Sequence, residues 1–231
     1  MRSALSDLRL GIQRLRAIAA DISASTPQAL KDPALRQRHE TIQCACPVLL
    51  SGYFEVFLKD VAQVFTGDLC RLGKPFATLP NRIQRNHFVR GAPLIAAKLD
   101  GRASAVWVTA THDDLARRLS SVCSPTAVYE LVWEAFADTR GNPGPDVVRD
   151  FLCNFGVESW VEKFNSFASP PWNWNTVRVH LTSFLALRNE CAHTGNSSAI
   201  PSPSSIEGHC EMIGAISDTI AKVLEEHLRV L

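Results

Sequence analysis

The chain has 231 residues, of which 46% are hydrophobic and 20% are charged, with 24 Lys and Arg against 23 Asp and Glu. This composition is typical of a globular protein that buries a sizeable core. The net charge of +1 excludes recruitment of nucleic acid or membrane by a global positive field. Any basic surface must therefore be local.

The N-terminal residues 3–24 carry leucine and isoleucine at helical spacing, with charged residues between them. This pattern predicts an amphipathic helix, because a secretion signal needs an unbroken apolar segment instead. No apolar run reaches the roughly 18 residues of a membrane span. We therefore expect a soluble, cytoplasmic protein without a membrane partner.

A second long helical pattern covers residues 34–66, after a break at the two prolines of "STPQALKDP". Pro47 lies inside this pattern and should kink or split the helix near Cys46, because proline lacks the backbone N–H and clashes with the preceding turn. A third helix is expected over residues 81–99, with interruptions at Gly91 and Pro93.

The middle of the chain is the least regular part. Residues 99–114, "LDGRASAVWVTATHDD", are strand-like or irregular, and Thr111 or Asp113 is expected to cap a short helix that runs towards Ser121. Ser124–Pro125 predicts the start of a further helix that runs to about Asp138.

Two glycines and two prolines in "DTRGNPGPD" predict a loop after that helix. Asn173 or Asn175 is expected to be the N-cap of the helix that carries the motif described below. The pattern as a whole predicts one all-α domain over residues 1–231, a helical bundle with decorated loops. The last helices are expected at residues 145–154, 157–168, 174–194 and 205–230.

The seven cysteines contain no CxxC pair, and we expect them to be reduced and mostly buried. Cys44 and Cys46 form a close pair, but no second pair of ligands follows them, so no zinc or other metal site is predicted. Cys191 and His193 lie about 200° apart on a helix, so they cannot pair, and Cys191 should face the core.

The stretch "ALRNECAHTG" places Arg188, Asn189 and His193 at the end of an apolar helix. Asn189 and His193 share a face, whereas Arg188 and His193 lie about 140° apart around the helix axis. A site that uses both needs another element or a second copy of this helix. Gly195 is suited to the left-handed position that ends a helix, which places His193 in the last turn.

These three residue types suit phosphodiester cleavage without a metal or another cofactor. Arg188 can stabilise charge on a phosphoryl group, the His193 imidazole can transfer a proton, and Asn189 can fix its tautomer. Such chemistry uses the 2′-hydroxyl of RNA as the nucleophile. The alternative is structural, because arginine and histidine near a helix C-terminus often only cap carbonyl groups.

The "RNECAH" motif resembles the signature of HEPN domains, in which an arginine, a polar residue and a histidine lie near the end of a long helix. The blocks "LLSGYFEVFLKDVA", "LPNRIQRNHF", "GNPGPDVVRDFLCNFGV" and "LTSFLALRNECAHTG" occur in the order found in the RiboL-PSP-HEPN and MAE-type HEPN families. The resemblance is clearest over residues 35–195.

The resemblance implies a homodimer in which two motifs face each other, with Arg188, Asn189 and His193 as catalytic residues acting on RNA. It implies a metal-independent endoribonuclease, a toxin or phage-defence effector with a possible antitoxin or defence-system partner. HEPN toxins that pair with nucleotidyltransferase antitoxins carry a tyrosine two residues after the histidine, where this chain has Gly195, so silencing at such a tyrosine is not supported. The alternative is a non-catalytic HEPN module for RNA or nucleotide binding or for assembly.

Three arginines in "NRIQRNHFVR", Arg82, Arg85 and Arg90, are candidates for contacts with the RNA backbone. The alternative is an ordinary solvated helix face. His87 between them is expected to serve surface or packing contacts.

Two tryptophans in "SPPWNWNTV", Trp172 and Trp174, could stack RNA bases, but closure of the bundle is the favoured interpretation. Glu55 is a carboxylate on an apolar helix face. We expect it to pair with an arginine, within the bundle or at the dimer contact.

Overall fold

The computed structural model describes the whole chain except residues 103–104, 125–127, 140 and 195–199. Within the described residues it contains eight α-helices, short 3-10 turns and no strand. The all-α prediction is therefore confirmed.

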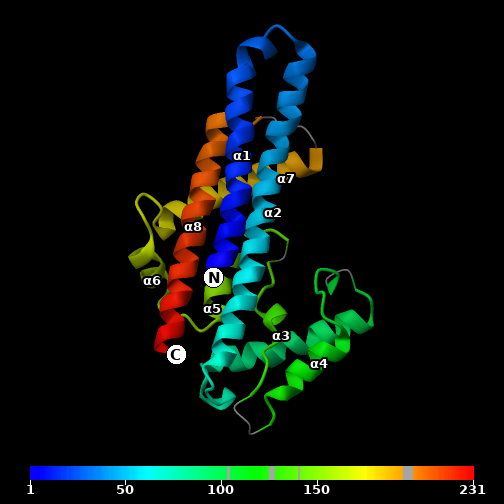
Figure 1. Cartoon of the computed structure of the whole chain (residues 1–231), viewed down its shortest axis with the longest axis vertical. Helices are drawn as coiled ribbons and strands as arrows, with labels where there is room; N and C mark the ends of the chain where they lie inside the picture. Colours follow the sequence, from blue (N-terminus) through cyan, green and yellow to red (C-terminus); the bar gives the residue numbers. More distant parts are fainter. Residues whose placement is uncertain (103–104, 125–127, 140, 195–199) are drawn as a thin grey trace.

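Three long helices form the body of the molecule. Helices α1 (Arg2–Ala29), α2 (Pro33–Arg71) and α8 (Pro203–Val230) lie side by side along its long axis (Figure 1). Helix α1 is tied to α8 by ion pairs from Arg9 to Asp218 and from Arg16 to Glu207, each 2.8 Å long.

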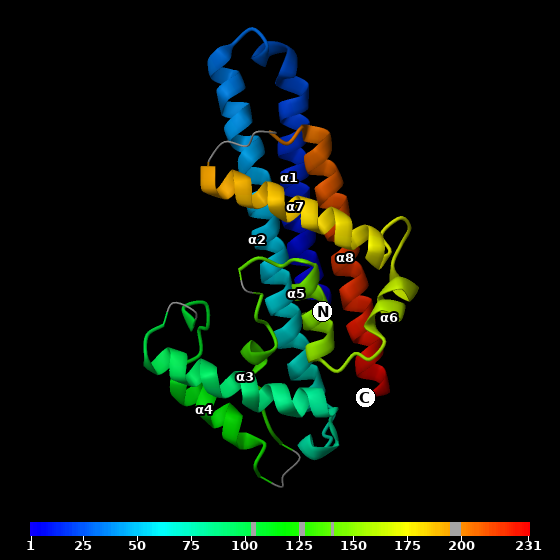
Figure 2. The ribbon, with the colours of Figure 1, turned by 180° about the vertical axis from the view of Figure 1, so that it is seen from behind.

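The helix with the RNECAH motif, α7 (Trp174–Thr194), crosses this layer, and its C-terminal end extends beyond α2 (Figure 2). A lobe formed by α3 (Asn81–Leu99) and α4 (His112–Ser121) lies on the same side of α2, near its other end. Two shorter helices, α5 (Pro145–Asn154) and α6 (Trp160–Phe167), lead the chain from the lobe back to α7.

The prolines interrupt the helices less than predicted. Helix α2 is one helix of 39 residues that runs through Pro47, so the predicted split is wrong, and α1 likewise runs through Pro27. The loss of one helical hydrogen bond, worth about 3 kcal/mol in a helix interior, is outweighed by burial of α2 along its length. The break falls instead before Pro33, where the Asp32 carboxylate accepts hydrogen bonds from the amides of Ala34 and Leu35.

Helix α3 also runs without interruption through Gly91 and Pro93. Gly91 serves packing rather than a break, because a Cβ there would lie only 3.0 Å from the side chain of Leu119 in α4. The start of α4 is as predicted, with Thr111 as the N-cap in a reciprocal capping box with Asp114. The described residues between the two helices form irregular turns and no strand.

The predicted helix over residues 124–138 is wrong where the structure describes it. Residues 128–132 are irregular, and only a 3-10 turn, η3 (Trp133–Ala135), follows. Side chains form hydrogen bonds with this backbone instead. The Ser121 hydroxyl donates to the Glu130 carbonyl oxygen and accepts from the Glu130 amide, and the Val132 amide donates to His87. Leu131 and Val132 are consecutive and both buried, whereas an amphipathic helix buries only one stripe.

One core cluster draws residues from the bundle, the lobe and their connections. Phe155, at the end of α5, packs between Phe65 of α2 and Phe136 beside η3, with ring centroids 4.6 and 5.2 Å away. All three rings are buried, and loss of such a ring typically costs 3–5 kcal/mol.

By length and composition alone, α2 is apolar enough to cross a membrane, although no such segment was expected from the sequence. Its most apolar window is 44% buried inside the bundle, and core helices of soluble proteins meet the same criterion.

His87 is fully buried at the centre of the lobe, in agreement with the expected packing role. Its Nδ1 accepts a hydrogen bond from the Val132 amide at 3.2 Å, and its Nε2 lies 3.4 Å from the carbonyl oxygen of Leu119. Burial lowers the pKa of His87 to about 4, against the partly offsetting hydrogen bond to Leu119.

This burial predicts that the protein loses stability as the pH falls from 6.5 towards 4. Over that range the unfolded chain binds a proton at His87 and the folded chain does not. We expect a loss of about 2 kcal/mol in the free energy of unfolding by pH 5, measured by urea denaturation, from this residue. His87→Gln should flatten the dependence, with His112→Gln at an exposed position as the control; an unchanged slope in His87→Gln would contradict the assignment.

Candidate functional site

The start of α7 is held in place by side chains that also exclude its tryptophan from solvent. The Asn173 side chain accepts a hydrogen bond from the Thr176 amide at 3.1 Å, which confirms Asn173 as the N-cap. Trp174 is buried against Trp160 and Phe164, with ring centroids 4.5 and 5.4 Å away. Trp174 therefore closes the bundle, as favoured, and is not available to stack an RNA base.

The buried residues of α7 follow one stripe, and Arg188 lies on it. Val177, Leu181, Phe184 and Cys191 are all buried. Arg188 is four residues after Phe184 and three before Cys191, the spacing of a single helix face. The helix thus places a permanent cation where an apolar side chain would complete the core.

Arg188 is half-buried, and its polar atoms are only partly satisfied. One guanidinium nitrogen, Nη1, donates to the Asn189 Oδ1 at 3.0 Å. The Nε atom is buried without a hydrogen-bond partner, and no ion pair to Arg188 is found in the part of the chain that the structure describes. A buried N–H without an acceptor is costly, so the guanidinium is held at this position at a cost in stability.

His193 is exposed in the last turn of α7. Among the described residues no hydrogen bond joins it to Asn189, whose Oδ1 is taken by Arg188. The helix rise of five residues separates Arg188 and His193 by about 7.5 Å along the axis, on faces about 140° apart. The structure therefore brings Arg188 and Asn189 together and leaves His193 open to solvent, while Gly195 lies outside the described residues.

Cys191 faces the core, as predicted, and touches Cys44 on α2. Both thiols are buried and unoxidised. Burial, with smaller effects from Cys44, raises the pKa of Cys191 to about 11. In the described residues no group of three or more histidine, cysteine or acidic side chains is placed to hold a metal ion.

Glu55 forms a network that differs from the predicted one. Its carboxylate pairs with Lys59 at 2.7 Å and accepts a hydrogen bond from the Thr139 hydroxyl at 2.9 Å, so the arginine partner expected within the bundle is wrong, and one at a dimer contact stays a prediction. The Lys59 ammonium in turn lies over the Trp107 ring, 4.7 Å from its centroid. The network ties the connection after η3 and the lobe to the middle of α2.

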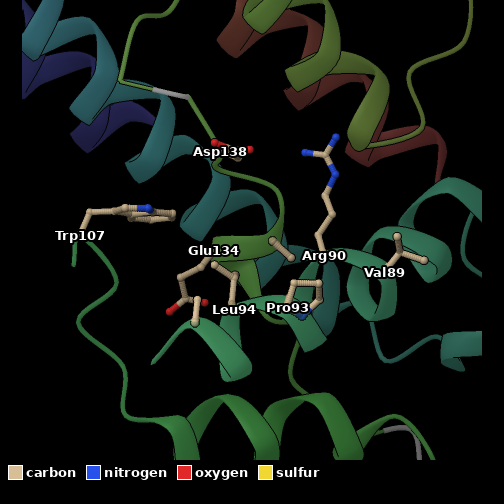
Figure 3. A pocket seen from close by; sticks show the side chains of 9 residues that line it. Val89, Arg90, Pro93, Leu94, Trp107, Glu134 and Asp138 are labelled. Atoms are coloured by element: carbon tan, nitrogen blue, oxygen red, sulfur yellow. The ribbon is translucent and has the colours of Figure 1, made fainter. Parts of the chain in front are cut away.

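The three arginines of α3 do not form one patch at the motif. Arg82 and Arg85 are exposed, and α3 lies across one end of α2 whereas α7 crosses further along (Figure 2). Arg90 is half-buried and lines a pocket beside Trp107, a residue that no sequence pattern indicated as functional (Figure 3). No periodicity in "LDGRASAVWVTATHDD" marked Trp107, because its position follows from contacts with Lys59 of α2 and Trp133 of η3.

Comparison with known proteins gives a family and no individual relative. No curated protein and no solved structure matches the chain. The model of the RiboL-PSP-HEPN family matches residues 13–226, which include all of α7 and nearly all of the bundle. The match extends beyond the region where the resemblance was clearest and confirms it: the chain belongs to the RiboL-PSP-HEPN family.

Proposed function

We propose that this chain is a metal-independent endoribonuclease that cleaves RNA with Arg188, Asn189 and His193. Membership in the family supports an RNA-related function in general. The specific proposal is carried by one observation: Arg188 lies on the buried stripe of α7 with a buried Nε that has no acceptor among the described residues. Phosphate oxygens are among the acceptors that match the guanidinium fork.

The chemistry follows from the groups present. The 2′-hydroxyl oxygen attacks the adjacent phosphorus, its proton passes to the His193 imidazole, and the bond from phosphorus to the 5′-oxygen breaks. The leaving 5′-oxygen takes a proton from water and the His193 imidazolium returns its proton to water, so the products are a 2′,3′-cyclic phosphate and a 5′-hydroxyl. Arg188, held by Asn189, stabilises the charge on the phosphoryl oxygens.

The separation of Arg188 from His193 supports a site assembled from two copies of the chain. Helix α2 carries an exposed apolar stripe with heptad spacing, and it begins beside Cys44, which touches the motif residue Cys191. The a/d spacing is that of a helix that packs against another helix. The stripe consists of Ile42, Ala45, Leu49, Gly52 and Val56.

We propose that a second copy covers this stripe, which brings the end of α7 in one copy towards that in the other. Ala45 and Gly52 are small enough for two α2 backbones to approach closely, and a Cβ added at Gly52 would meet nothing within 4 Å in the single chain. The heptad is short, so the dimer also needs contacts from α7.

The biological setting is part of the same proposal. The enzyme acts in the cytoplasm as a toxin or a phage-defence effector, restrained by an antitoxin or a defence-system partner, because catalytic HEPN proteins with this motif have such roles. Restraint by modification of a tyrosine after the histidine is not proposed, since the chain has Gly195 there.

The catalytic assignment predicts that Arg188→Ala and His193→Ala each reduce RNA cleavage by two to four orders of magnitude, the effect typical of losing a charge-stabilising or proton-transfer group. Cleavage of a tRNA pool is measured in EDTA, with product ends identified by mass spectrometry as 2′,3′-cyclic phosphate. Arg178→Ala, an exposed arginine earlier in α7, is the control. Equal cleavage by all variants would refute the proposal, and RNA binding by a parent that does not cleave would favour the non-catalytic module.

The shared site predicts that the two inactive variants complement each other. Arg188→Ala and His193→Ala chains are co-expressed with different affinity tags and purified as the mixed dimer. One of its two sites then combines an intact Arg188 with an intact His193, so about half of the parent activity should return. A mixed dimer as inactive as either variant would place both residues of each site in the same chain.

The interface assignment predicts that Leu49→Asp combined with Val56→Asp yields a folded monomer without cleavage activity. Both positions are exposed in the single chain, so the charges disfavour association but not folding. Mass is measured by light scattering and folding by circular dichroism. Val230→Asp, at an exposed apolar position at the end of α8, is the control; a dimeric, active double variant would rule out this interface.

A further inference from the structure

The pocket between α3, Trp107 and the η3 segment is a cavity of about 290 Å³ that the cleavage site does not use (Figure 3). The proline and aliphatic side chains of α3 form its apolar wall, and Arg90, Glu134 and Asp138 contribute charged groups. Small-molecule sites typically combine such an apolar lining with a few convergent polar groups. We call this cavity the Trp107 pocket, lined by Val89, Arg90, Pro93, Leu94, Ala97, Trp107, Glu134, Ala135 and Asp138.

Trp107 is held in place as a platform. The Lys59 ammonium covers its ring at 4.7 Å from the centroid, and the Trp133 ring packs against it edge-on at 6.0 Å. Lys59 is itself held by Glu55, which accepts a further hydrogen bond from Thr139. A fixed, half-buried indole loses little entropy when a planar ligand stacks on it.

The charged groups of the pocket have opposite signs and different surroundings. Glu134 is almost fully buried, and Arg118 donates to both its carboxylate oxygens at 3.2 and 3.3 Å. A carboxylate has about four lone-pair sites, so Glu134 can still accept from a ligand N–H. Arg90 makes no hydrogen bond or ion pair within the described residues and is therefore available to an anion, and Asp138 lies opposite it in Figure 3.

A ligand that matches this lining has a planar aromatic body, N–H donors at one edge and an anionic group. A nucleotide has all three: the base stacks on Trp107, its amino group donates to a carboxylate, and its phosphate meets Arg90. Amino groups are present on adenine, cytosine and guanine but not on uracil.

The pocket and the motif lie along the same side of α2. Cys44 contacts the motif helix at Cys191, and Lys59 contacts Trp107. These two α2 residues are fifteen positions apart, which corresponds to about 22 Å along the helix and a rotation of only about 60°. One RNA strand can therefore reach both places with a few nucleotides between them.

We propose that the Trp107 pocket binds one unpaired, amino-bearing base of the RNA substrate, with Arg90 on its phosphate, a few nucleotides from the cleaved bond. The placement of the cleaved RNA bond at His193 rests on the proposed function, whereas base binding in the pocket does not. The pocket thereby selects where a strand is cut.

The test measures binding in the His193→Ala background, in which RNA stays intact. Titration calorimetry with AMP, CMP, GMP, UMP and a short single-stranded RNA is carried out with and without Trp107→Ala and Arg90→Ala. Loss of one stacked base corresponds to about 10- to 100-fold weaker binding. Trp107→Phe keeps a stacking ring and should bind nearly as the parent does, and Arg14→Ala, an exposed arginine of α1, is the control.

A second measurement locates the bound base. Abasic nucleotides are placed one at a time along the RNA, and a single position should weaken binding to the parent pocket but not to the Trp107→Ala variant. Equal RNA affinity of the Trp107→Ala, Arg90→Ala and control variants would overturn the proposal. So would an abasic nucleotide that weakens binding equally in the parent and in the Trp107→Ala variant. Base binding by a parent chain that never cleaves RNA would refute only the endoribonuclease assignment, and cleavage that is indifferent to Trp107 and Arg90 would refute only the pocket.

Discussion

Burial of helix α2 on several sides is the constraint on which the rest of the structure depends. Its 39 residues contact α1 and α8 on one side, α7 on another and the η3 segment near its end. Apolar burial along this length outweighs the cost of Pro47 inside the helix. Because one continuous helix carries all these contacts, it also sets the spacing between the motif and the lobe. A break in the helix at Pro47 would have left the spacing between the motif and the lobe unfixed.

The position of Arg188 shows how packing and chemistry share one helix. The stripe of α7 that packs into the bundle continues through Arg188 to Cys191, so the guanidinium is partly withdrawn from water. The electrostatic interactions of the guanidinium are strengthened by that withdrawal, whereas His193 remains exposed to solvent. Partial burial of a cation without a carboxylate partner among the described residues costs stability. An RNA phosphate would offset that cost only when substrate is bound.

The lobe is built on a different principle from the bundle. Its connecting segments lack regular structure, and their backbone groups form hydrogen bonds with side chains, the buried His87 and the partly exposed Ser121, in place of a helix or sheet. The indole of Trp107 is positioned by Lys59 and Trp133, from α2 and the η3 segment.

The sequence by itself determined the helical class and most helix positions, because these depend on local periodicity, capping and spacing. The three motif residues were instead predicted from the resemblance to the HEPN signature. Asn173, Thr111 and Cys191 behave as the local patterns predicted. Helix boundaries at proline did not follow from the sequence, because burial by distant segments offsets a local cost. Nor did the irregular course of residues 128–132, whose hydrogen-bond partners come from residues up to 45 positions away.

For the candidate site, the sequence named Arg188 and Asn189 but not their contact, and it assigned Asn189 to His193 instead. The tertiary structure alone decided that Arg188 lies at the edge of the core, that Lys59 is the partner of Glu55, and that Arg90 and Trp107 line one pocket. Each of these depends on which helices cross and at what height along α2. Local sequence patterns carry no information about such crossings, because the crossings are set by the packing of surfaces far apart in the chain.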